Sequence, residues 1–266
     1  MKEPFVLLIF ISDERGLVMG ATTIFAADCF LLAGRLLMQS GAETYRAEDT
    51  MLRMARSQGY EDAQSFVTPT GIIFSAGHES PTRIAQIPKR ATDLTKIAEI
   101  NTISRKLTSH QITIEEAHDQ LKTLEQKNLF MSEFAQVIYA AIASGCFVIL
   151  FMGSIVDMPA AAVAGGIGHW VCLRMNAITK VKFFAEFTAS IAVGLLTILF
   201  LHIGFGFQED KIIIGAVMPL VPGVPIANAV RDMMAGHFVS GVTKGAEASL
   251  TALAIGSGIA FVLILF

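Results

Sequence analysis

Hydrophobic and polar positions follow different patterns in the two halves of the chain. In the first half, apolar residues recur with helical or strand periodicity and polar residues interrupt every run. In the second half, long apolar runs follow one another with few charges between them. This pattern predicts a cytosolic α+β domain at residues 22–131 and a membrane domain at residues 132–266, preceded by an N-terminal extension at residues 1–21.

The helices predicted for the first domain have recognisable start signals. Helical periodicity is found at residues 22–38, 43–58, 92–107 and 113–127. Ser40 and Glu43 have the spacing of a capping box, and so do Thr113 and Glu116. The residue at position 41 is glycine, so the first two helices could also be one long helix that Gly41 interrupts.

Two short segments of the first domain favour strands. Residues 65–76 and 82–87 are rich in β-branched and aromatic residues, and a polar turn containing Gly and Pro separates them. We expect them to form a β-hairpin. A dense polar cluster around Glu43 and Glu48 is expected to be a solvated helix face without a chemical role.

The second half predicts five membrane crossings. They are expected at about residues 134–153, 158–173, 184–204, 211–230 and 246–266. Asp157 and Pro159 are suited to start the second of them as N-cap and first-turn residues. Small residues at 160–168 and 254–260 permit close helix approach, and we expect these faces to need helices from outside the chain.

The fourth crossing contains prolines at three-residue spacing. Proline removes a backbone donor and clashes with the preceding turn, so Pro219, Pro222 and Pro225 must break the helix. In lipid, the freed backbone groups must be satisfied by protein or by water in a cavity. Broken helices of this kind hold substrates and ions in secondary transporters.

The candidate site is centred on this break. The residues proposed for substrate binding or coupling are Pro219, Pro222, Gly223, Pro225, Asn228, Arg231 and Asp232. Arg231 can bind a carboxylate, and Asp232 can hold Arg231 or carry a proton. Alternatively, Arg231 and Asp232 pair with each other in solvent at the cytoplasmic end of the crossing. Glu186 and His169 are the next candidates in the membrane domain.

Charge supports this division and gives an orientation. Residues 1–131 hold 14 Lys and Arg and 16 Asp and Glu, whereas residues 132–266 hold 6 and 7. A net charge of −3 gives no electrostatic surface for nucleic acid. The basic residues of the second half that fall in cytoplasmic connections are Arg174, Lys180, Lys182, Arg231 and Lys244. They place the N-terminal domain in the cytoplasm and the C-terminus outside.

The remaining sequence features exclude several classes. Cys29, Cys146 and Cys172 stand far apart without a CxxC partner, so neither a metal site nor a disulfide framework is predicted. No cofactor motif is found. The apolar run at residues 4–11 is about half as long as a membrane span, which favours an extension or a short docking segment over a cleaved signal.

Four segments resemble the threonine/serine exporter family. They are "SGAETYRAEDTMLRMA" (40–55), "TPTGIIFS" (68–75), "ITIEEA" (112–117) and "PLVPGVPIANAVRD" (219–232). The similarity covers about residues 22–266, and the last segment is the most specific. It implies a cytosolic N-terminal region, a membrane domain in the bacterial cytoplasmic membrane, and export of threonine and serine or, in two-subunit members, of a dicarboxylate such as succinate.

The length of the chain points to the split form of that family. One-chain members have about twice as many spans, so this chain resembles the larger subunit of the two-subunit form. The resemblance therefore implies a second, small five-span subunit as partner, in a pair or in a higher oligomer. A membrane-anchored hydrolase and a membrane-anchored sensor are the alternatives. No nucleophile and base can be identified for the first, and a simple anchor does not need a broken span.

Overall fold

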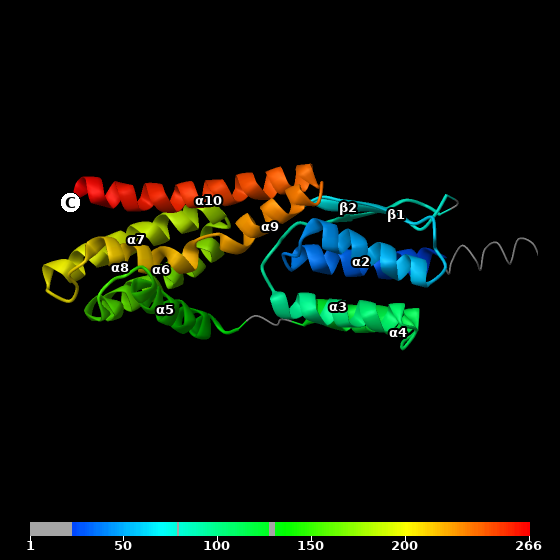
Figure 1. The fold of residues 1–266 in the computed structure, drawn as a ribbon, viewed down its shortest axis with the longest axis horizontal. Helices are drawn as coiled ribbons and strands as arrows, with labels where there is room; N and C mark the ends of the chain where they lie inside the picture. Colours follow the sequence, from blue (N-terminus) through cyan, green and yellow to red (C-terminus); the bar gives the residue numbers. More distant parts are fainter. Residues whose placement is uncertain (1–22, 79, 128–130) are drawn as a thin grey trace, which may run out of the picture. The chain divides into compact units, whose positions relative to one another are not determined.

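The computed structural model describes residues 23–78, 80–127 and 131–266, and the predicted extension at 1–21 lies outside them. The described residues are mainly helical with one small sheet (Figure 1). They form two compact units. The first unit comprises residues 23–127 and 227–244, and the second comprises residues 131–226 and 245–266. The assignment of these parts to cytosol and membrane stays a prediction.

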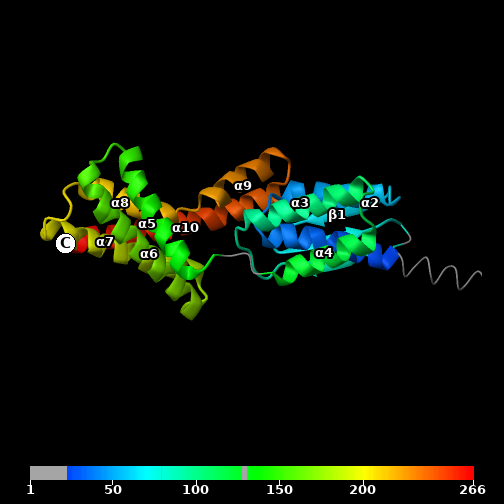
Figure 2. The same ribbon diagram turned by 90° about the horizontal axis from the view of Figure 1, so that it is seen from below.

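The first unit combines helices with a sheet of three strands. Residues 23–39 are helical. The further elements are α2 (Thr44–Ser57), β1 (Gln64–Val67), β2 (Gly71–Ser75), β3 (Arg83–Gln86), α3 (Leu94–Thr108) and α4 (Ile114–Gln126). Figures 1 and 2 show α3 and α4 side by side, and α3 also packs against α2. The core is apolar and includes an edge-to-face contact of the Phe30 and Phe74 rings, whose centroids are 6.0 Å apart.

The sheet is antiparallel in the order β1-β2-β3. The hairpin predicted at residues 65–76 and 82–87 is found as β2 and β3, with Gly71 opposite Gln86. The first segment holds two strands rather than one. The backbone N–H of Thr68 donates to the carbonyl of Gly71 at 2.9 Å, which closes a tight turn between β1 and β2. The additional strand was missed although Pro69 and Gly71 are turn residues, because the segment was interpreted as one strand.

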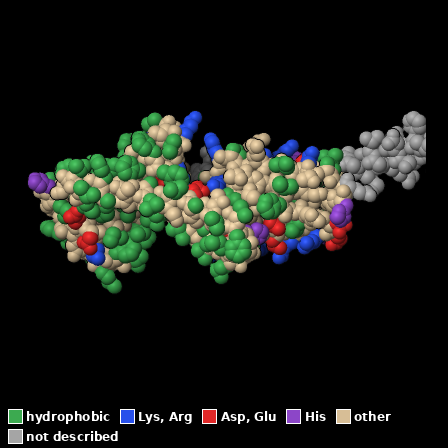
Figure 3. Space-filling view, turned by 90° about the horizontal axis from the view of Figure 1, so that it is seen from above, with side chains coloured by type: hydrophobic (Ala, Val, Ile, Leu, Met, Phe, Trp, Pro, Cys, Tyr) green, Lys and Arg blue, Asp and Glu red, His purple; other side chains and the backbone are tan. Residues whose placement is uncertain are grey.

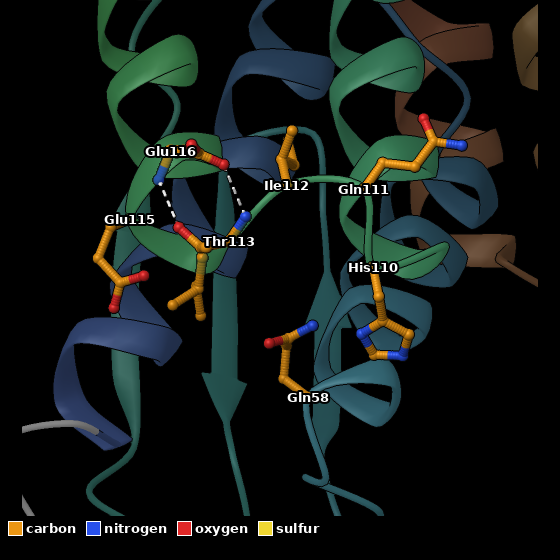
Figure 4. A pocket seen from close by; sticks show the side chains of 8 residues that line it. Gln58, His110, Gln111, Ile112, Thr113, Glu115 and Glu116 are labelled. Atoms are coloured by element: carbon orange, nitrogen blue, oxygen red, sulfur yellow. Dashed lines mark hydrogen bonds between the residues drawn. The ribbon is translucent and has the colours of Figure 1, made fainter.

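One predicted capping box is confirmed and the other is wrong. At the start of α4, the N–H of Glu116 donates to Thr113 Oγ1 at 3.3 Å, and the N–H of Thr113 donates to the Glu116 carboxylate at 2.9 Å (Figure 4). At the start of α2, Glu43 is the N-cap residue and its side chain makes no cap bond. Ser40 lies in the turn before it, where Gly41 has φ +81°, so the chain forms two separate helices.

The second unit contains the long apolar helices. Its elements are α5 (Glu133–Leu150), η1 (Ile155–Asp157), α6 (Met158–Thr179), α7 (Lys182–His202), α8 (Glu209–Val217) and η2 (Met218–Leu220). Two further helices, α9 (Gly223–Met234) and α10 (Phe238–Leu265), have residues in both units. Figure 3 shows much of the surface of the second unit covered by hydrophobic side chains, as a lipid environment requires.

Four described helices are long and apolar enough to cross a membrane, and a bent fifth crossing is added if α8 with η2 is joined to α9. The two parts of this pair meet at an angle of 61°. The break predicted at the prolines is therefore confirmed. The helix that holds the last predicted span begins at Phe238, before residue 246. Lys244 thus lies inside a helix and is 7% exposed, which corrects its assignment to a connection between helices.

The small-residue faces are filled from within the chain, contrary to our expectation. A Cβ at Gly165 of α6 would lie 2.0 Å from Ser144 Oγ on α5. A Cβ at Gly258 of α10 would lie 2.0 Å from Ser190 Oγ on α7. Both glycines let helices of the same unit approach closely, so these faces are no evidence for a second subunit.

Candidate functional site

The start of α2 and the end of α9 are joined by the Asp232 carboxylate. Its Oδ1 accepts a hydrogen bond from the backbone N–H of Thr44 at 2.8 Å, and its Oδ2 accepts one from the Thr44 hydroxyl at 2.9 Å. Both residues are 0% exposed. The cap that the sequence predicts from Ser40 is thus supplied by an aspartate 188 residues away in the chain.

Lys244 of α10 completes the environment of this carboxylate. Its ammonium donates to Asp232 Oδ2 at 2.7 Å, to Thr44 Oγ1 at 3.2 Å and to the carbonyl of Ala42 at 3.2 Å. The side chains of Lys244 and Asp232 are 8% and 0% exposed, so this ion pair is shielded from water. We call Asp232, Lys244 and Thr44 the Asp232 clamp. Its three donors to one carboxylate leave no charge uncompensated.

Arg231 has a different partner from the one expected. Its Nη1 donates to the carboxylate of Glu43 at 2.7 Å, and the Arg231 side chain is 61% exposed. Arg231 and Asp232 therefore do not form the solvated pair of the alternative hypothesis. Glu43, whose side chain is only 7% exposed, is not part of a solvated face either. Next to it, the Asn228 amide donates to the carbonyl of Gly41 at 2.8 Å.

The pKa of Glu43 reflects these partners. Burial alone would raise the pKa of this carboxyl, but hydrogen bonds from a backbone N–H and from Arg231, together with the charge of Arg46, outweigh it. The pKa of Glu43 is consequently lower than that of an ordinary glutamate. The ionised form is the one that the surrounding groups favour.

The proline break itself is partly packed and partly open. Pro219 lies in η2, and Pro222 is buried between η2 and α9. Gly223 begins α9, and a Cβ built there would meet no atom within 4 Å. Pro225 lies in the first turn of α9, where a missing N–H is tolerated. The break thus presents a helix start with open space beside its first residue.

Glu186 and His169, the further candidates in the membrane domain, lie in the second unit. Asn228, Arg231 and Asp232 lie in the first. Glu186 is 6% exposed, and its Oε2 is buried without a hydrogen-bond partner among the described residues. His169 is half-buried, and its Nδ1 likewise has no partner within the described part of the chain. Asp157 is fully buried and accepts hydrogen bonds from the N–H groups of Phe207 at 2.7 Å and Gln208 at 3.4 Å.

The sequence left three participants unassigned. They are Thr44, Lys244 and, as the partner of Arg231, Glu43. Lys244 carried a signal, because a single lysine within an apolar helix is expected to be paired. Across residues 23–78, 80–127 and 131–266, no three His, Cys, Asp or Glu side chains come together as a metal site would need. Chemically, the clamp can fix the ends of helices, while the exposed guanidinium of Arg231 can still bind an anion.

The chain is similar to proteins described as transporters. It is 27% identical over 236 residues to "Probable succinate transporter subunit YjjP" of Klebsiella aerogenes, an alignment that covers 84% of this chain and 87% of that protein. It is 24% identical over 240 residues to the protein of the same description from Escherichia coli, covering 86% and 90%.

A longer protein is also similar. The "Probable threonine/serine exporter" of Mycobacterium tuberculosis is 23% identical over 238 residues, which cover 87% of this chain but 44% of that protein. No solved structure matches the chain. The family model described as "Putative threonine/serine exporter" matches residues 28–266, which include both the Asp232 clamp and the proline break. The chain is a membrane transport protein and belongs to the threonine/serine exporter family.

Proposed function

We propose that this chain is the larger subunit of a secondary transporter that exports threonine and serine, or a dicarboxylate such as succinate, across the bacterial cytoplasmic membrane. The observation that carries the proposal is the break between η2 and α9 in a chain of this family. An anchor or a sensor has no need of such a break, because freed backbone groups are costly in lipid.

The substrate is proposed to bind at the break. The prolines interrupt the backbone, and the open space beside Gly223 leaves the start of α9 accessible. Pro225 has no N–H and the N–H of Gly223 donates to the carbonyl of Val221 at 2.8 Å, so the partial positive charge of the helix start is the feature that favours a carboxylate here. Both candidate substrate classes carry a carboxylate, so the break by itself does not choose between them.

Arg231 lies eight residues after Gly223, about 12 Å further along α9, and is proposed to contact a substrate carboxylate at that end of the helix. Asp232 and Asn228 are proposed to act as anchors. Only one nitrogen of Arg231 is used by Glu43, and the side chain is largely exposed. Asp232 already accepts from three donors, so a direct role in substrate or proton binding would require the clamp to open. This division refines the hypothesis that treated all three as one site.

A second subunit is proposed because of the relatives, not because of unpaired helix faces. The two closely length-matched relatives are described as transporter subunits, and the Mycobacterium protein is more than twice as long as the region that it shares with this chain. A small five-span membrane protein of the same family would supply the missing part. The lipid-facing surface leaves room for it, since many large hydrophobic side chains of the second unit are exposed.

The N-terminus is proposed to lie in the cytoplasm and the C-terminus outside. Lys180 and Lys182 lie at the connection of α6 and α7, whereas Glu209 and Asp210 begin α8. Arg174 supports this less than expected, because it lies within α6 and pairs with Glu133 at 2.9 Å. The two lysines at one connection and the two acidic residues at the other still agree with the positive-inside rule.

Substrate exchange tests the proposed function. The chain is purified together with a candidate partner, a small five-span membrane protein of the same family, and placed in vesicles loaded with unlabelled threonine, serine or succinate. We expect labelled substrate to enter against its own unlabelled form for one of the two classes. Exchange of none of the three would refute the proposal. Exchange of all three at equal rates would refute the expectation that the site selects one of the two substrate classes.

A further inference from the structure

Glu186 is a buried carboxylate with an unsatisfied oxygen inside the second unit. It lies on α7, it is 6% exposed, and its Oε2 has no hydrogen-bond partner among the described residues. Thr251 of α10 turns its hydroxyl toward this carboxyl. That hydroxyl oxygen is also buried and unbonded within the described part of the chain. A buried carboxylate with an unsatisfied oxygen is costly in an apolar interior. The Thr251 hydroxyl can donate to the carboxylate or accept from the protonated acid, so it can serve as a partner in either protonation state.

A second polar pair lies one helical turn away. Lys182 precedes Glu186 by four residues on α7, and Glu247 precedes Thr251 by four residues on α10, so each pair of positions shares a helix face. The Lys182 ammonium contacts the Glu247 carboxylate at 3.3 Å, and these side chains are 45% and 31% exposed. The pair of Lys182 and Glu247 is thus partly exposed. About 5.4 Å further along the two helices, the pair of Glu186 and Thr251 is buried.

Beyond Glu186, α7 and α10 pack closely against each other. Ser190 comes one turn further along α7, and its hydroxyl donates to the carbonyl of Phe187 at 2.8 Å. A Cβ at Gly258 of α10 would lie 2.0 Å from Ser190 Oγ, so only glycine fits there. We call the row of polar side chains between α7 and α10 the polar path. It begins at Lys182 and Glu247 and ends at Glu186 and Thr251.

The end of this path adjoins the proline break. Ala189 of α7 packs with Leu220 of η2 and with Ile255 of α10. Cys172 of α6 packs against the same cluster and lies close to Glu186. Ala189 lies three residues after Glu186 on α7, so a change in the charge of Glu186 would act close to the helices that hold the break.

We propose that Glu186 takes up and releases the proton that couples the transport cycle to the pH gradient, a role that rests on the proposed export function. A proton from water at the Lys182 and Glu247 pair adds to Oε2 of Glu186, and no other bond breaks. The new O–H donates to the Thr251 hydroxyl, which satisfies both oxygens.

Neighbouring groups favour both the neutral and the ionised form of the Glu186 carboxyl. The neutral acid suits a side chain that is only 6% exposed and lies near the Cys172 thiol. The carboxylate is attracted by Lys182 and repelled by Glu247, the charged groups that face it from α7 and α10. Proton exchange therefore switches the inner pair between a closed, neutral form and a charged form that draws in water or Lys182.

The test uses the purified complex in vesicles and separates coupling from transport. In Glu186→Gln, we expect accumulation driven by a pH gradient to be lost, while exchange of substrate at equal pH continues and no longer depends on pH. Glu209→Gln is the matched control, because Glu209 is an exposed glutamate at the start of α8. This control should retain both gradient-driven accumulation and the pH dependence of exchange.

A spectroscopic measurement makes the test independent of folding and of the substrate. Infrared difference spectra of the complex between acidic and alkaline pH should contain the carbonyl band of a buried carboxylic acid. This band should vanish in Glu186→Gln, shift in Glu186→Asp and move to a different frequency in Thr251→Val, which removes the acceptor of the O–H.

Three outcomes would overturn the proposal. The first is gradient-driven accumulation retained by Glu186→Gln. The second is a carbonyl band unchanged by that substitution. The third is loss of exchange at equal pH in a folded Glu186→Gln complex, which would make Glu186 a substrate ligand. If the wild-type complex transports none of the substrates, the proposed function fails, and the infrared band alone then decides whether Glu186 exchanges a proton.

Discussion

The carboxylate of Asp232 caps the helix that begins at Thr44, accepting its backbone N–H at 2.8 Å and its hydroxyl at 2.9 Å. The two residues belong to the two segments that carry the family resemblance, 40–55 and 219–232. Their bond explains why a polar sequence follows the proline break. Part of the segment serves to attach α9 and α10 to α2 within the first unit.

The clamp predicts a large loss of stability when one member is removed. Asp232→Asn leaves the Lys244 ammonium buried without a counter-charge, which should lower the free energy of unfolding by about 3–5 kcal/mol. Adding Lys244→Met should recover most of this loss, because no buried charge then remains. Denaturant unfolding of the purified chain in detergent measures both variants.

An exposed ion pair in the same unit supplies the control. Arg53 and Asp49 contact each other at 2.8 Å on the surface of α2, with side chains 70% and 53% exposed. Asp49→Asn should change the free energy of unfolding by less than about 1 kcal/mol. Equal effects of Asp49→Asn and Asp232→Asn would show that the clamp does not stabilise the fold.

Arg231→Lys tests whether the exposed guanidinium contacts substrate. Lysine keeps the charge next to Glu43 but loses the planar two-pronged donor. If Arg231 binds the substrate carboxylate, the lost charge-assisted bond of about 1.5–3 kcal/mol should weaken the apparent affinity by roughly tenfold to hundredfold. Concentration dependence of exchange measures it. Wild-type affinity in Arg231→Lys would restrict Arg231 to its contact with Glu43.

The lowered pKa of Glu43 predicts a dependence of stability on pH. Because the pKa in the folded chain is below the ordinary value of 4.5, the ionised carboxylate contributes stability above about pH 4.5. That contribution is lost as the pH falls through the lower, folded pKa. Glu43→Gln should therefore be less stable than wild type near neutral pH, and the difference should shrink in acid. A constant difference between the unfolding midpoints at all pH values would contradict this.

The orientation predicts opposite accessibility for two connections. Lys180 lies between α6 and α7, and Gln208 directly precedes α8. In a chain whose three native cysteines are replaced, a cysteine at 180 should react with an impermeant reagent only from the cytoplasmic side. A cysteine at 208 should react only from outside. Reaction of both from one side would exclude a single crossing by α7.

The sequence predicted what depends on local pattern. Apolar run length gave the spans, Thr113 and Glu116 gave the start of α4, and the prolines gave the break. The sequence-based prediction was wrong where a residue distant in the chain caps a helix in place of a local residue. Ser40 and Glu43 have the spacing of a capping box, yet Asp232 provides the cap, because Ser40 lies in the turn before the helix and Glu43 is paired with Arg231.

Burial was the second property that local pattern could not supply. Lys244 was assigned to a cytoplasmic connection because the apolar run after it is long enough to form a span by itself. Its burial follows only from the position of Asp232 beside it. Likewise, the partner of Glu186 could not be identified from sequence, because Thr251 is one of several hydroxyl residues at helical spacing on α10.

The need for a second subunit is the most direct test of the proposed function. Vesicles are prepared with this chain, with a candidate small five-span membrane protein of the same family, or with both, and are loaded with labelled threonine or labelled succinate. We predict rapid efflux of one of the two substrates only from vesicles that contain both proteins. Robust efflux from vesicles that contain this chain alone would contradict the split-transporter interpretation and show that the chain forms a pathway by itself.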